Sequence, residues 1–179
     1  MSDQRQSVIS LIQGEYRVSS RPDAVITTIL GSCVAACLFD PHHGIGGMNH
    51  FLLPGADPRD RQNIKYGAYA MEQLINALLR KGAQRASLMA KVFGGAAVVR
   101  SLSDIGRNNA DFALAFLKEE GIAVSAQCLG GTQGRRVRFW PHDGRAQVML
   151  MQASDVDPAL PREVPTRPVA PMAGEVDLF

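Results

Sequence analysis

Short apolar runs rich in β-branched residues dominate the first third of the chain. Residues 24–30 read AVITTIL and residues 34–39 read VAACLF, and glycine or proline residues bound both runs. Such runs predict β-strands. Residues 44–53 begin with a glycine-rich turn and continue as a third predicted strand, which ends at Pro54.

Helical periodicity appears next. Ala70, Leu74 and Leu78 recur at every fourth position and predict a helix over residues 68–79, with Gly82 as its stop. A second helix is predicted over residues 110–120. Further strands are predicted near residues 86–92, 122–128, 136–140 and 147–151. Because the strands come in runs, the pattern predicts an α+β fold in which helices cover a mixed β-sheet.

The chain divides into one compact unit and a tail. Residues 8–152 are predicted to form a single domain, whereas residues 153–179 carry five of the ten prolines and are predicted to be a flexible linker. The tail closes on an acidic and apolar tip, residues 175–179. Two interpretations of this tip stay open, a frayed end and a docking peptide for a partner groove.

Composition narrows the function classes. A net charge of +2 selects neither nucleic acid nor a membrane surface, and the basic group Arg135, Arg136 and Arg138 is interpreted as a solvated strand face. No apolar run is long enough for a membrane span, and no secretion signal is visible at the N-terminus. Three cysteines, an odd number, favour a reducing cytoplasm.

Cys33 is the candidate nucleophile. It follows Gly31 and Ser32, two small residues that permit a sharp turn and leave room for a substrate carbonyl. Backbone N–H groups at such a turn can also stabilise an oxyanion. The competing interpretation is a buried cysteine that packs as a small hydrophobic residue, and this is the preferred interpretation for Cys37.

A thiol needs a base within hydrogen-bond reach, and His50 is the best candidate. A strand from Val34, a turn, and a returning strand would bring His50 beside Cys33, because antiparallel neighbours lie about 5 Å apart. A hydroxyl from Thr27 or Thr28 would orient the imidazole. These adjacent strand residues face opposite sides, and the pattern does not choose between them.

Zinc is the rival use of these residues. Cys33, Cys37, His42, His43 and His50 are suitable ligand types, but Cys33 and Cys37 on one strand would lie about 13 Å apart. We therefore predict no metal site. No phosphate-binding loop or dinucleotide fingerprint is present, and we predict no cofactor.

Several stretches, taken together and in order, resemble the CheD family of chemoreceptor glutamine deamidases. They are residues 27–34 (TTILGSCV), 46–54 (GGMNHFLLP), 91–96 (KVFGGA), 105–108 (IGRN) and 130–135 (GGTQGR). The resemblance implies a layered fold related to bacterial glutamine-deamidating toxins. It also implies hydrolysis of receptor glutamine to glutamate through a thioester.

The resemblance implies a role for each site residue. Cys33 is the nucleophile and His50 the base, and the third residue falls six positions before the cysteine, on Thr27. The family usually has an acidic residue where this chain has Cys128. The implied partners are methyl-accepting chemotaxis receptors and a CheC-type phosphatase.

A groove for a receptor helix is the remaining expectation. Phe93, beside Gly94 and Gly95, is the candidate wall, because an exposed aromatic next to bare backbone suits helix docking. The alternative for Phe93 is core packing. The alternative function for the whole chain is a non-catalytic module that regulates receptors or a phosphatase by occupancy.

Overall fold

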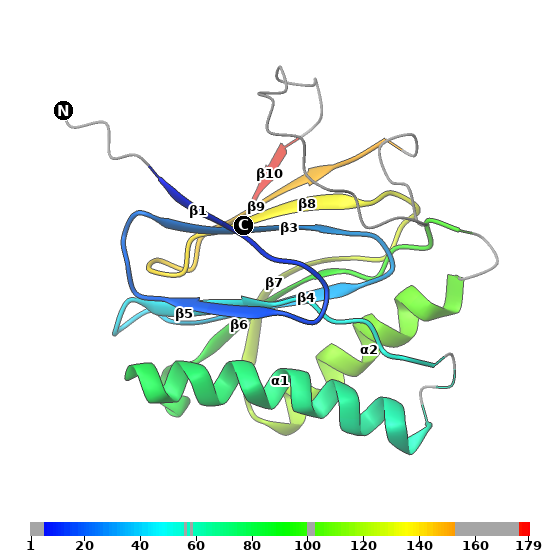
Figure 1. The fold of residues 1–179 in the computed structure, drawn as a ribbon, viewed down its shortest axis with the longest axis horizontal. Coiled ribbons are helices and arrows are strands. Elements are labelled where there is room, and N and C mark those ends of the chain that lie inside the picture. The colour runs from blue at the N-terminus through cyan, green and yellow to red at the C-terminus, as the bar shows by residue number, and fades with distance from the viewer. Residues whose placement is uncertain (1–5, 56, 58, 100–102, 153–175) are drawn as a thin grey trace.

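The computed structural model describes residues 6–55, 57, 59–99, 103–152 and 176–179. These residues form three layers, in which two β-sheets pack face to face and two helices cover the outer face of one of them (Figure 1). The predicted α+β class is confirmed. The sheet, however, is divided into two sheets of five strands.

Each sheet is mixed. The first sheet has the order β1-β3-β8-β9-β10 and contains one parallel pair, β1 with β3. Its strands are Ser7–Ser10, Ala24–Leu30, Arg135–Phe139, Ala146–Leu150 and Val176–Leu178 in that order. The second sheet has the order β2-β5-β4-β6-β7, and β6 is parallel to β7. Its strands are Tyr16–Ser19, Ile45–Asn49, Val34–Asp40, Met89–Gly94 and Ala123–Leu129.

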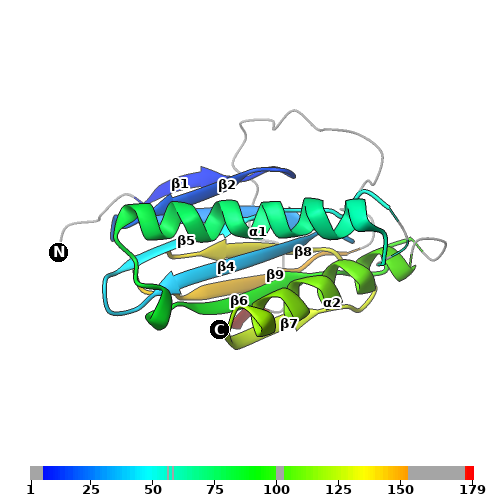
Figure 2. The same cartoon turned by 90° about the horizontal axis from the view of Figure 1, so that it is seen from below.

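Both helices lie against the second sheet (Figure 2). Helix α1 spans Arg61–Lys81 and α2 spans Ser103–Glu119, and a 3-10 turn at Arg85–Ser87 precedes β6. Both helices start earlier than predicted, because their first turns carry mostly polar residues and show no apolar stripe. For α1 the start signal is Asp60, whose side chain accepts from the Gln62 N–H. The predicted stop is confirmed: Gly82 has φ 109° and caps the helix.

Strand β4 is buried on both faces and separates two hydrophobic clusters. Val34, Ala36 and Leu38 face the helices, whereas Ala35, Cys37 and Phe39 face the first sheet. This double burial explains why the segment reads as a continuous apolar run. It also confirms Cys37 as a core residue, fully inaccessible to solvent.

Phe93 is not the exposed aromatic that a groove wall would require. Its side chain is 0% exposed and belongs to the cluster between the two sheets. Residues of β6 alternate between the helix face and the inter-sheet face, and Phe93 falls on the latter. The alternative interpretation, core packing, is the one that the structure supports.

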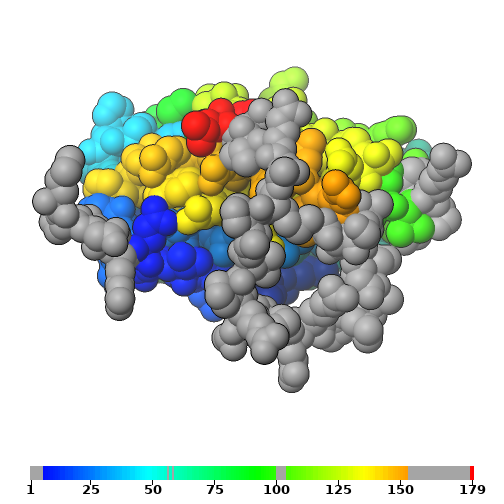
Figure 3. All heavy atoms as spheres, turned by 90° about the horizontal axis from the view of Figure 1, so that it is seen from above, coloured from blue at the N-terminus to red at the C-terminus, as the bar shows by residue number. Residues whose placement is uncertain are grey.

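Residues 176–179 of the C-terminal tip are paired with the first sheet. Val176–Leu178 pair antiparallel with β9, and Phe179 exchanges backbone hydrogen bonds of 2.9 and 3.0 Å with Ala146. The Phe179 ring meets Phe93 edge-on at 5.9 Å. Figure 3 shows the tip at the edge of the first sheet, beside β9. The rest of the predicted linker, residues 153–175, lies outside the described residues.

Arg135 also departs from its prediction. It is only 2% exposed, and its guanidinium donates to the carbonyl oxygens of Cys128 and Gly130 and to the Cys128 sulfur. Burial lowers the pKa of this guanidinium. Arg135 therefore ties the start of β8 to the end of β7.

Gly94 and Gly95 bring the end of β6 against the turn at Cys33. The N–H of Gly95 donates to the Cys33 carbonyl at 2.8 Å. Gly94 has φ 114°, and a Cβ at this position would overlap the same carbonyl oxygen. These glycines are therefore required for close backbone packing beneath Cys33.

Gly94→Ala is expected to destabilise the fold strongly, because it combines an unfavourable φ with a backbone overlap. Gly121→Ala is the matched control, since Gly121 has φ 70° and no atom within 4 Å of an added Cβ. The control is expected to lower the unfolding free energy by about 1–2 kcal/mol, and Gly94→Ala by at least twice as much in urea titrations. Equal losses would contradict the packing role.

Candidate active site

Cys33 lies where the chain passes from one sheet to the other. Gly31, Ser32 and Cys33 form the connection between β3 of the first sheet and β4 of the second, and all three are partly exposed. Burial raises the pKa of the Cys33 thiol to about 11, and its own backbone N–H opposes this shift. The thiol donates to the carboxamide oxygen of the exposed Gln13 at 3.5 Å.

The pairing of β4 with β5 puts Cys33 and His50 on the same face. Beyond the end of β5, Val34 and Phe51 exchange backbone hydrogen bonds of 3.0 and 2.9 Å. In this register His50 stands opposite Ala35, and Cys33 is its diagonal neighbour. Diagonal neighbours on one face have their Cα atoms about 7–8 Å apart, and the small Ala35 side chain leaves space between them.

Thr28 determines the tautomer of His50. The Thr28 hydroxyl donates its single proton to the Leu11 carbonyl at 2.7 Å, because a carbonyl can only accept. The His50 Nδ1 lies 2.8 Å from the same hydroxyl oxygen. Nδ1 must therefore carry a proton and donate it to Thr28, which leaves Nε2 with a free lone pair.

The structure distinguishes the two threonines by their hydrogen-bond partners. Thr27, the residue that the resemblance assigns, donates its hydroxyl to the Val137 carbonyl at 2.9 Å. Thr28 is 4% exposed and faces the space between the sheets. Alternation along β3 separates the two side chains, so Thr28, and not Thr27, contacts His50.

The Nε2 atom of His50 has a free lone pair that can accept a proton. It is buried and meets no hydrogen-bond partner within the described residues. Burial lowers the pKa of the imidazole to about 4, so the ring is neutral at neutral pH. No hydrogen bond joins Cys33 and His50 in this structure, and burial disfavours the charged form of each side chain.

A loop that sequence reasoning missed holds this arrangement. Residues 11–15 connect β1 to β2 and hydrogen-bond with Thr28, Cys33 and His50. The Gly14 N–H donates to the His50 carbonyl at 2.7 Å, and the His50 N–H donates to the Glu15 carbonyl at 3.0 Å. Gly14 has φ 88°, and this glycine was the available signal of a sharp turn.

The backbone carbonyls of the Cys33 turn accept hydrogen bonds from the segment that follows β6. Gly31 accepts from the Ala96 N–H at 2.9 Å and Cys33 from the Gly95 N–H at 2.8 Å. Within the described part of the chain, the N–H groups of Ser32 and Cys33 donate to no other residue's backbone. These two donors are the candidates for an oxyanion site, as expected for the Gly31-Ser32 turn.

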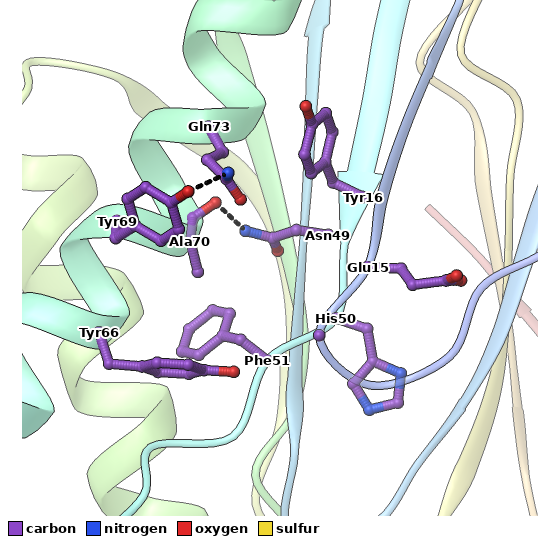
Figure 4. Close-up of a pocket in the computed structure, with 10 residues that line it drawn as sticks. Glu15, Tyr16, Asn49, His50, Phe51, Tyr66, Tyr69, Ala70 and Gln73 are labelled. Carbon is purple, nitrogen blue, oxygen red and sulfur yellow. Dashed lines mark hydrogen bonds between the residues drawn. The ribbon is translucent and has the colours of Figure 1, made fainter.

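Two hollows adjoin this region. One lies on the α1 side of His50 and is lined by Tyr66, Tyr69 and Gln73, and the His50 ring points away from it (Figure 4). The other lies beside α2 and the end of β7, and Gly95 contributes to it. Of the three residues predicted to form a groove, Gly95 alone lines a hollow described here.

Neither metal ligation nor membrane insertion has a visible basis in the described residues. They contain no group of three or more His, Cys, Asp or Glu side chains that could hold a metal ion. Within the same residues, neither helix is long and apolar enough to cross a bilayer.

Comparisons with known proteins agree on one family. The family model described as CheD chemotactic sensory transduction matches residues 52–150. A relative from Acidiphilium cryptum is 53% identical over 178 residues, which cover 96% of this chain and 93% of the relative. One from Agrobacterium fabrum is 50% identical over 175 residues, which cover 96% of each chain. Both carry the name probable chemoreceptor glutamine deamidase CheD.

A solved structure shows a weaker likeness. A Neisseria meningitidis protein of family DUF152 superposes with a TM-score of 0.48 at 12% identity, over 71% of this chain and 65% of that one. This score is too low to define the fold. The sequence relatives are decisive: with more than half of its length matched by the family model and about half of its residues identical to near full-length relatives, this chain belongs to the CheD family.

Proposed function

We propose that this protein hydrolyses the side-chain amide of specific glutamines in the cytoplasmic helices of chemotaxis receptors, and so converts them to glutamate. The main observation behind this proposal concerns the Nε2 atom of His50, which has no hydrogen-bond partner among the described residues. Thr28 determines the tautomer that leaves this atom unprotonated. His50 also shares a strand face with the Cys33 thiol. Membership of a family whose relatives are named chemoreceptor glutamine deamidases supports the substrate class.

The first half of the reaction forms a thioester. As the Cys33 sulfur attacks the carboxamide carbon, its proton passes to Nε2 of His50. The carbonyl oxygen becomes an oxyanion, which the N–H groups of Ser32 and Cys33 are placed to stabilise. The His50 Nε2–H then protonates the nitrogen, ammonia leaves, and a thioester remains on Cys33.

The second half releases glutamate. A water molecule gives a proton to Nε2 as it attacks the thioester carbon. Collapse of the tetrahedral intermediate expels the sulfur, which recovers its proton from His50. The chemistry needs no group beyond those of the chain and water.

Burial determines the protonation states in which Cys33 and His50 begin the reaction. A thiolate–imidazolium pair would require two charges in a site whose burial disfavours both, as the raised thiol pKa and lowered imidazole pKa indicate. We therefore assign neutral His50 the role of general base, which takes the proton during attack.

Receptor access fits the exposed side of the site. The Gln13 carboxamide reaches the sulfur from the solvent side, so a glutamine on a partner helix has the same approach. The hollow lined by Gly95, Arg107 and Asp111 is a candidate site for contacts with the receptor residues that flank this glutamine. A CheC-type phosphatase as a further partner stays a prediction from the family resemblance.

Cys33→Ala is expected to abolish deamidation, because it removes the sulfur that forms the thioester. A purified receptor cytoplasmic fragment would be incubated with each variant and examined by mass spectrometry for a one-dalton gain at glutamine. Cys128→Ser is the matched control and should retain activity. Unchanged deamidation by Cys33→Ala would overturn the mechanism, and absence of activity in the parent would favour the non-catalytic module.

Thr28→Val is expected to lower kcat by about 10- to 100-fold, by analogy with the loss of a residue that orients a metal-bound histidine through a hydrogen bond. Valine keeps the shape but cannot accept from Nδ1. Thr27→Val is the control and should change kcat less than twofold. The reverse order of effects would restore the assignment of Thr27.

Acidification is expected to destabilise the parent through His50. Between pH 6.5 and about 4 the unfolded histidine binds a proton that the folded one does not, so the unfolding free energy falls as pH falls. From pH 7 to pH 5 this contribution is about 2 kcal/mol, and urea titrations of His50→Gln should lack it. The exposed His42→Gln variant serves as control. A His50 held as imidazolium by a thiolate would give the opposite sign.

A further inference from the structure

Asn109 is a buried polar residue that the reaction above does not use. It lies on α2 with 0% exposure, and both ends of its amide are engaged. Its oxygen accepts from the Leu53 N–H at 2.9 Å, and its nitrogen donates to the Ser32 carbonyl at 2.9 Å. One side chain thus joins α2, the segment that follows His50, and the peptide that precedes Cys33.

The first turns of α2 are held rigidly against this region. A Cβ at Gly106 would lie 2.6 Å from the carbonyl oxygens of Gly95 and Ala96, so the helix backbone rests directly on the segment that tethers the Cys33 turn. Asn109 stands three residues later, on the same helix face. Its amide therefore has a well-defined position relative to the turn.

Peptide geometry converts this contact into an orientation of the nucleophile's own N–H. The described residues contain no cis peptide bond, and in a trans peptide the C=O and N–H point in opposite directions. Because Asn109 holds the Ser32 carbonyl, the Cys33 N–H of the same peptide points away from α2. It points toward its own sulfur, whose thiolate form it stabilises.

We propose that Asn109 is a positioning residue for the deamidation, which it serves by orienting the Ser32–Cys33 peptide so that the Cys33 N–H donates to the oxyanion. The inference rests on the proposed function. Aspartate cannot replace asparagine here: its carboxylate still accepts from Leu53 N–H but has no proton to donate to the Ser32 carbonyl. Repulsion between the two oxygens would then rotate the peptide.

Asn109→Asp therefore separates positioning from scaffolding. In steady-state kinetics with the receptor fragment, kcat is expected to fall about 100-fold, the low end of what one oxyanion donor contributes, while KM stays within twofold. The rate of Cys33 alkylation by iodoacetamide, followed by peptide mapping, should fall far less than kcat. Alkylation forms no oxyanion, and it reports whether the thiol is still in place.

Asn63→Asp is the matched control. Asn63 is 1% exposed and its amide likewise bridges backbone groups, accepting from the Gly55 N–H and donating to the Gly55 carbonyl, but it contacts no residue of the site. It should keep the parent's kcat. If Asn109→Asp does not fold by circular dichroism, Asn109→Ser, which is too short to reach Ser32, replaces it with the same expected loss.

The outcomes distinguish this inference from the proposed function. A parent without deamidase activity sinks the proposed function and, with it, this role. An active parent with unchanged kcat in Asn109→Asp overturns the positioning role alone. Equal losses in kcat and in the alkylation rate assign Asn109 to the scaffold and also overturn the proposal.

Discussion

The arrangement of the site depends on which group accepts the hydroxyl proton of Thr28. Thr28 has a single proton, and the Leu11 carbonyl takes it. His50 must then donate from Nδ1, and Nε2 is left as a free base in a buried setting. Backbone contacts with the 11–15 loop hold the histidine on both sides. The reactivity of the imidazole therefore follows from backbone groups of a loop that has no chemical motif of its own.

The turn that carries Cys33 is held by a second set of contacts. Each carbonyl of the turn from Gly31 to Cys33 is bonded from the side of β6 and α2, through Ala96, Asn109 and Gly95. Such close approach is possible because Gly94 and Gly106 have no side chain. With its carbonyls turned inward, the turn presents N–H groups on the other side, where an oxyanion would form. Glycines that take no part in the proposed reaction thus determine which backbone groups face the site.

The two sheets explain why these sets meet. Cys33 lies on the connection between the sheets, Thr28 belongs to the first sheet, and His50 follows a strand of the second. The site therefore exists only when the sheets are packed face to face. Phe93, Val137 and Phe139 are fully buried in that interface, and the C-terminal Phe179 packs at its margin.

Local pattern was sufficient for much of this protein. The apolar runs, the Gly82 stop and the small residues before Cys33 depend on contacts a few residues apart, and the elements they predicted are present. The likeness to CheD followed from short motifs, and relatives confirm it. Other features needed the tertiary structure, because they join residues far apart in the chain: the division into two sheets, the burial of Arg135 and Phe93, the docked tip, and the contact of Asn109 with Ser32. The choice of Thr28 over Thr27 belongs with these. Alternation shows that the two threonines face opposite ways, but only the packing of the second sheet reveals which way His50 lies.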